Sequence, residues 1–214
     1  MMTFYGDSNT VGYGLGAYDK DMVELFTPLN YGVSASQAAE VSSAVQQLAP
    51  VATMVYATNV GLNDVSRYMN DAAKKEYCRR VMRAVVGWLA LPTKKTARGA
   101  QAGITFTGTW ADTPSPNTCG KYTTQNGATA SATVSGDTVF IGVSEGDYST
   151  MGESINVTID GVSQGNFSVK VPGVTTWLNQ WWGRAAWKFS GLGAGSHTVV
   201  VTQNSPSGKF LHLD

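Results

Sequence analysis

Short apolar runs alternate with helical patterns over the first hundred residues. Two segments, 36–48 and 70–91, repeat apolar residues at helical spacing, and the second is the stronger, with Asn70 or Asp71 as its cap and Pro92 as its stop. The apolar runs, which resemble buried strands, are 2–5, 29–32 and 51–57. The order strand, helix, strand, helix predicts a parallel sheet with right-handed crossovers.

Beyond residue 104 the pattern changes to strands separated by turn signals such as Asp160-Gly161 and 191–195. The cleanest alternation of apolar and polar residues is at 155–159. The expected strands are 130–134, 138–143, 155–159, 167–171, 185–189 and 198–202. This spacing predicts an antiparallel β-sandwich, of jelly-roll type, after the α/β segment.

Three segments follow from this division. Residues 1–99 form an α/β domain, residues 100–208 form the β-sandwich, and residues 209–214 begin another strand of the first domain. If that strand opens a further part of the first domain, the chain holds only a portion of it. An exposed sheet edge there favours a homo-oligomer or a completing polypeptide.

The amino-acid composition indicates which kinds of binding partner are not expected. Only 14% of the 214 residues are charged and the formal net charge is zero, so neither nucleic acid nor a membrane is expected as a partner. The N-terminus lacks the features of a signal peptide, and a virion or extracellular protein of this composition would leave the cell by another route. We expect Cys78 and Cys119 not to be joined in a disulfide.

The first chemical candidate is Ser8, in Gly6-Asp7-Ser8, directly after the first strand. Ligands bind at the carboxyl ends of strands in open parallel sheets, and a serine there exposes both its hydroxyl and its backbone N–H. A helix-capping serine at a strand–helix turn is the alternative interpretation.

Two other segments strengthen the catalytic interpretation. Asn30-Tyr31-Gly32 ends the second strand, and Gly61-Leu62-Asn63-Asp64 follows the third. In a parallel sheet these sites share one edge, where Ser8, the Gly32 amide and the Asn63 side chain would form a nucleophile with an oxyanion hole. Taken singly, Gly32 is explained as a turn glycine and Asn63-Asp64 as a helix cap.

These motifs, in this order, resemble the first three of four diagnostic blocks of the SGNH (GDSL-type) serine hydrolase family, over about residues 2–98. The resemblance implies a flavodoxin-like α/β/α fold and an esterase or deacetylase that often acts on acylated sugars, with neither a metal nor a cofactor. It assigns Ser8 as nucleophile, and the Ser8 amide, Gly32 and Asn63 as the oxyanion hole. Asp7 and Asp64 are predicted to support these residues. Ala35 stands where the second block often has a further glycine.

The fourth block, Asp-x-x-His, is missing. The chain has two histidines, His197 and His212, and neither follows an aspartate at that spacing, so both are expected to be turn or strand-surface residues. Without a base Ser8 is a weak nucleophile, so we expect the base to come from elsewhere. An SGNH core interrupted by a carbohydrate-binding-type sandwich resembles some phage tail-fibre and tailspike proteins.

Tryptophans offer a second kind of site. Four of them lie within 177–187, and Trp187 alternates with Phe189 and is expected to face the core, as is Trp110. The adjacent Trp181 and Trp182 lie beside polar residues, and at least one of the pair is exposed if the segment is extended. They are candidates for stacking on a polysaccharide or acylated glycan, with core packing as the alternative.

Two functions from different classes follow. The first is an SGNH-type esterase or deacetylase for acylated carbohydrate, and the second is a carbohydrate- or receptor-binding module without catalysis. A purely structural piece of a virion is a third, weaker option.

Overall fold

The computed structural model describes residues 2–6, 28–32, 55–59, 70–91, 95, 103–112, 120–147, 149–174 and 183–213. For the first three of these ranges it describes the backbone alone. They are the strands β1 (Met2–Gly6), β2 (Pro28–Gly32) and β3 (Val55–Asn59), which form a parallel sheet in the order β2-β1-β3. The sequence prediction of three parallel strands is thus confirmed, and residues 51–54 of the third expected strand lie outside the described residues. The helix predicted at 36–48 lies outside the described residues.

Helix α5 (Ala72–Ala90) agrees with the predicted helical segment. Asp71 is its N-cap, because its carboxylate accepts hydrogen bonds from the backbone N–H groups of Ala73 and Lys74. The helix ends at the cap residue Leu91, immediately before Pro92. None of the helices in the described ranges is long and apolar enough to cross a bilayer.

The rest of the described chain is an antiparallel β-sandwich, as predicted. Sheet I has the strand order β10-β9-β12-β7-β4, and sheet II has the order β11-β8-β13-β6-β5. The strands are β4 (Ile104–Thr107), β5 (Ala111–Asp112), β6 (Lys121–Thr123), β7 (Thr129–Ser135), β8 (Thr138–Glu145), β9 (Ser154–Ile159), β10 (Val162–Ser168), β11 (Gly183–Ser190), β12 (Ser196–Gln203) and β13 (Leu211–Leu213).

The core lies between the two sheets. In β9 the alternating residues Ile155, Val157 and Ile159 are buried, as their pattern predicts. Asp160-Gly161 forms the two-residue connection to β10, and both residues have positive φ, as a type I′ hairpin turn requires. The strand expected at 167–171 is instead β10, at residues 162–168, because this tight turn starts it immediately after β9.

Strand β13 corrects the expectation for residues 209–214. It pairs antiparallel with β6 and β8 inside sheet II, so it completes the sandwich rather than beginning another strand of the parallel sheet. Leu211 and Leu213 are buried in the sandwich core, and this burial explains the choice of sheet.

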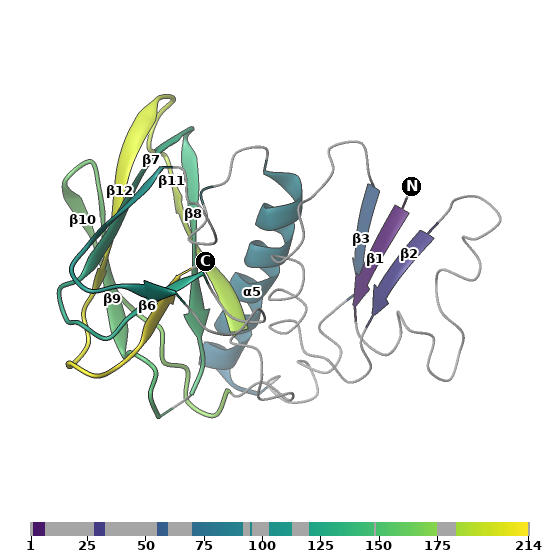
Figure 1. The fold of residues 1–214 in the computed structure, drawn as a ribbon. Coiled ribbons are helices and arrows are strands. Elements are labelled where there is room, and N and C mark those ends of the chain that lie inside the picture. Colours follow the sequence, from purple (N-terminus) through teal and green to yellow (C-terminus); the bar gives the residue numbers. More distant parts are fainter. Residues whose placement is uncertain are drawn as a thin grey trace.

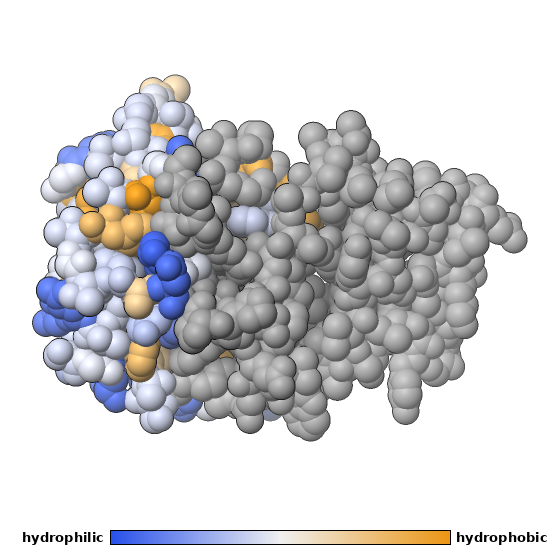
Figure 2. All heavy atoms as spheres, viewed as in Figure 1, coloured by the Kyte–Doolittle hydropathy of each residue, from blue (hydrophilic) through white to orange (hydrophobic). Residues whose placement is uncertain are grey.

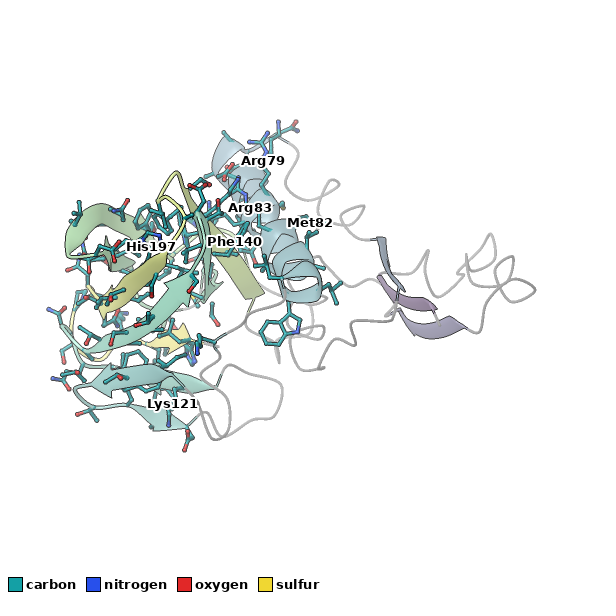
Figure 3. The ribbon with its side chains drawn as sticks, turned by 90° about the horizontal axis from the view of Figure 1, so that it is seen from above. Arg79, Met82, Arg83, Lys121, Phe140 and His197 are labelled. Atoms are coloured by element: carbon teal, nitrogen blue, oxygen red, sulfur yellow. The ribbon has the colours of Figure 1, made fainter. Side chains whose placement is uncertain are left out.

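Helix α5 packs against the sandwich, mainly on β11. Tyr77 and Val81 of the helix share an apolar cluster with Val171, Val174 and Ala185. In Figures 1 and 3, α5 lies between the sandwich and the parallel sheet. Helix α5, the first described helix after β3, is therefore part of the packing of the β-domain, although the boundary near residue 100 stays a prediction.

Candidate functional site

The carboxyl ends of the three parallel strands form one rim. Gly6, the last residue of β1, is in register with Gly32 at the end of β2 and with Asn59 at the end of β3. We call this edge, defined by Gly6, Gly32 and Asn59, the rim. Because β1 is the central strand, the segment that follows Gly6 leaves the sheet between the ends of its two neighbours.

The length of chain beyond the rim limits where the other candidate residues lie. Ser8 follows Gly6 by two residues, so its Cα lies within about 7 Å of that of Gly6. Asn63 follows Asn59 by four residues, which sets a limit of about 14 Å. Neighbouring strands are about 4.8 Å apart. The register therefore allows the three predicted residues to meet.

The structure describes only one of the predicted catalytic residues, Gly32, which it places at the rim as a backbone position. Ser8 and Asn63 lie outside the described residues, as do the supporting Asp7 and Asp64. Their roles stay predictions.

His197 is buried, contrary to the expectation of a surface or turn histidine. Its Nδ1 lies 2.7 Å from Oδ2 of Asp160, and its Nε2 lies 3.1 Å from the carbonyl oxygen of Gly193. The other carboxylate oxygen of Asp160 accepts a hydrogen bond from the backbone N–H of Thr198 at 2.8 Å. The ring thus ties the β9–β10 turn to the start of β12, and neither of its nitrogens faces an open site.

Both neighbours of the His197 ring are acceptors, so only the protonated imidazolium donates to both. The hydrogen bond to Asp160, followed by that to Gly193, raises the pKa of His197 above its usual value. The hydrogen bond from His197 is the main cause that lowers the pKa of Asp160.

The raised pKa of His197 predicts a pH dependence of stability. The protonated ring contributes fully to the free energy of unfolding below the unfolded pKa, about 6.5. This contribution is lost as the pH rises through the folded pKa. We therefore expect the native chain to have a higher Tm than His197→Gln, and the difference in Tm to be larger at pH 5.5 than at pH 8.5. A difference in Tm that is the same at both values would contradict this assignment.

His212 is the second buried histidine, again contrary to the expected surface position. It lies on β13, with its ring centroid 5.7 Å from that of Tyr122 and 5.6 Å from that of Phe210. The chain's two histidines thus both belong to the sandwich, packed against its own residues.

The tryptophans divide into two groups. Trp181 and Trp182 lie outside the described residues, so their contact with sugar stays a prediction. Trp187 packs against the core as predicted, with its ring 4.8 Å from that of Phe167, and Trp110 packs on Phe106 at 5.0 Å.

Sequence reasoning did not find the buried ion pair that joins α5 to the sandwich. The guanidinium of Arg80 donates to both carboxylate oxygens of Glu145, with Nη2 2.6 Å from Oε2 and Nε 3.0 Å from Oε1. The two side chains are only 7% and 0% exposed. The guanidinium carbon also lies 4.3 Å from the ring centroid of Trp187.

Two opposing causes act on Glu145. Burial raises its pKa to about 7, and the hydrogen bonds and charge of Arg80 oppose that rise. Arg80 and Glu145 are 65 residues apart in the sequence, and their paired hydrogen bonds join helix α5 to strand β8. Its place at the junction of α5 and β8 makes it a structural clamp.

The described residues also form a cavity inside the sandwich. This cavity, of about 300 Å³, lies between the sheets and the end of α5, with a largely apolar lining that includes Trp88, Ile104 and Ala130. Within the described ranges no group of His, Cys, Asp and Glu side chains is arranged to hold a metal ion. Cys78 is a reduced thiol on α5, and Cys119 lies outside the described part of the chain.

Comparisons with known proteins gave distant structural similarity only. No protein-family model matches the chain, and no curated protein matches it. A family two carbohydrate esterase from Clostridium thermocellum in complex with cellohexaose is similar over 52% of this chain and 29% of its own, with 18% identity and a TM-score of 0.38.

Two further solved structures show a comparable likeness. A CBM36 carbohydrate-binding module in complex with calcium and xylotriose aligns with 52% of this chain and 89% of its own, at 17% identity and a TM-score of 0.36. The catalytic domain of a GH87 α-1,3-glucanase in complex with nigerose aligns with 56% of this chain and 26% of its own, at 13% identity and a TM-score of 0.38. The aligned part spans less than a third of the esterase and of the glucanase.

Proposed function

We propose that this chain carries the nucleophile and oxyanion hole of an SGNH-type serine esterase that acts on acylated carbohydrate, and that the general base comes from outside the chain. The observation that supports the proposal is the register of the rim, in which Gly6, Gly32 and Asn59 end their strands side by side. Of the three motifs that resemble SGNH blocks, the first begins at Gly6, the second ends at Gly32, and the third begins two residues beyond Asn59.

The chemistry requires two parts. The Ser8 hydroxyl attacks an acyl carbonyl, and the N–H groups of Ser8 and Gly32 with the carboxamide of Asn63 donate to the oxygen that becomes negative. The serine must also lose its proton to a base during the attack. His197 and His212 are buried in the sandwich, and the nitrogens of His197 already have partners, which supports an external base.

An added base makes the proposal testable on the chain itself. We expect the chain alone to hydrolyse p-nitrophenyl acetate only slowly. With imidazole added, hydrolysis in the presence of the chain should be faster than hydrolysis by imidazole alone. Ser8→Ala should remove this excess, because it deletes the attacking oxygen, whereas Ser34→Ala, a change at a nearby serine outside the proposed oxyanion hole, should keep it.

Two results would count against parts of the proposal. If the excess rate survives in Ser8→Ala, Ser8 is not the nucleophile. If the unassisted chain hydrolyses the ester rapidly and Ser8→Ala abolishes this, the chain holds its own base and the external source is wrong.

The sandwich is the proposed carbohydrate-contacting part. Figure 2 shows that its visible described surface is mostly hydrophilic or neutral, with small apolar patches, which suits an uncharged, hydroxyl-rich ligand. The described outer positions of β9 and β12 are serine, threonine, asparagine and valine, without charge. The adjacent Trp181 and Trp182 would add flat apolar faces to this surface.

A glycan array tests this part separately from catalysis. We expect binding to a glycan to weaken about tenfold or more in Trp181→Ala or Trp182→Ala, because one stacked ring contributes about 1.5 kcal/mol. Lys188→Ala, an exposed change on β11, serves as the control. Absence of binding in the native chain, or binding that neither tryptophan change weakens, would leave the sandwich without this role.

A further inference from the structure

The core of the sandwich is not filled between β7, β8 and β12. Val139, Ile141, Val199 and Val201 belong to the core cluster, yet each keeps 5–7% of its surface exposed, whereas Ile155 of β9 keeps none. All four line the cavity of about 300 Å³ inside the sandwich. Protein cores are close-packed and hold few voids larger than a water molecule. A hollow of this size is therefore a feature that needs an explanation.

The hollow originates in the sequence of β7. Ala130 belongs to the core cluster, and Ala132, two residues further along the strand, faces the same side. Both alanines line the cavity. Ala132 pairs with Ile104 of β4 and with Val199 of β12, so a small side chain stands between two branched ones in the middle of sheet I. The carbons that β7 lacks at these positions leave the space.

The opening of the cavity carries positive charge. Trp88 of α5 lines it, and among the described lining residues the charged ones are Arg83 and Lys95, with no acidic residue beside them. Arg83 lies 3.2 Å from Glu76, whereas Lys95 is exposed and has no acidic partner within the described ranges. Figure 3 shows Arg83 and Phe140, a further lining residue, where the helix meets the sandwich. The cavity thus combines an apolar interior with a cationic opening.

We propose that this cavity binds an aliphatic monocarboxylate of about eight carbons, with its chain between the sheets and its carboxylate beside Lys95. An apolar cavity of about 150 Å³ holds one benzene molecule, so a cavity of 300 Å³ has room for such a chain. A sugar would leave its hydroxyl groups unpaired against the apolar lining, and an uncharged hydrocarbon would make no use of the ammonium group. This site is separate from the rim, and its occupancy does not depend on whether Ser8 is a nucleophile.

Isothermal titration of the full chain tests the ligand class. We expect octanoate to bind about 15-fold more tightly than hexanoate, because each added methylene contributes about fourfold. Lys95→Met should weaken octanoate binding about fivefold and leave the binding of 1-octanol unchanged, because only the carboxylate meets the ammonium group. Lys75→Met, an exposed change near the start of α5, is the matched control and should alter neither.

A filled cavity tests the location. Ala132→Leu places a larger side chain in the hollow and should abolish octanoate binding without lowering the Tm, whereas Thr133→Leu, an exposed change on the opposite face of β7, should keep the binding.

Three results would overturn the proposal. They are no binding of octanoate to the native chain, octanoate binding that survives in a folded Ala132→Leu variant, and a Lys95→Met variant that loses octanol binding as much as octanoate binding. If Ala132→Leu does not fold, the comparison of chain lengths and the Lys95→Met variant decide.

Discussion

Replacing Arg80 by methionine will lower the free energy of unfolding by about 3–5 kcal/mol, because it leaves the Glu145 carboxylate buried without its partner. The effect should depend on pH. Loss of the guanidinium removes the causes that oppose the rise in the pKa of Glu145, so this pKa moves further above 7. A carboxyl whose folded pKa exceeds its unfolded value, 4.5, loses stability as the pH rises between the two. The defect is therefore larger at pH 8 than at pH 5.

Two further variants distinguish the effect of the buried Arg80–Glu145 pair from that of an exposed ion pair. Arg83→Met removes a partner of Glu76 at 3.2 Å, but those side chains are 37% and 40% exposed, so the expected loss is about 0–1 kcal/mol. Arg80→Met combined with Glu145→Leu removes both charges and should recover most of the stability. Urea denaturation measures all three, and a loss in Arg80→Met no larger than that in Arg83→Met would show that the ion pair is not a clamp.

Asn63→Ala will reduce the imidazole-assisted, Ser8-dependent rate about 10²–10³-fold, because it removes one donor from the oxyanion hole. The donor acts on the charge that develops in the transition state, so the loss should appear in kcat with little change in KM. Steady-state hydrolysis of p-nitrophenyl acetate at fixed imidazole gives both constants.

An exposed asparagine of the sandwich, Asn166, provides the control for a carboxamide deletion, and Asn166→Ala should leave the rate unchanged. A loss of less than about threefold in Asn63→Ala, or an increase in KM alone, would remove Asn63 from the oxyanion hole.

The spacing of apolar residues was sufficient to predict those strands and helices that bury one face and expose the other. The alternation at 155–159 predicted β9, and Asp160-Gly161 predicted the turn after it, because a type I′ turn needs two residues that tolerate positive φ. Helix α5 followed from its periodicity, its cap and Pro92. The parallel direction of β1, β2 and β3 was predicted from the alternation of apolar runs with helical patterns, whereas their order in the sheet was not.

Long-range pairing could not be read from the same patterns. A short alternating segment such as 211–213 fits a strand in either sheet, and only the burial of its leucines in the sandwich decides between them. Arg80 and Glu145 are 65 residues apart, and a charged residue on a helix is usually solvated. The sequence predicts an exposed His197, because nothing in its own turn shows that Asp160 pairs with it. Of the candidate site, the rim register fits the prediction, while Ser8 and Asn63 stay predicted.

The most direct test of the proposed function is a crystal structure of the chain with a tetrahedral anion such as phosphate or an organophosphonate. The account predicts that Ser8 Oγ faces the anion and that the Gly32 N–H and the Asn63 carboxamide both donate to one of its oxygens at about 2.7–3.1 Å. Should the hydroxyl of Ser8 be buried, or should Gly32 and Asn63 face different sides of the rim, the esterase assignment would be contradicted.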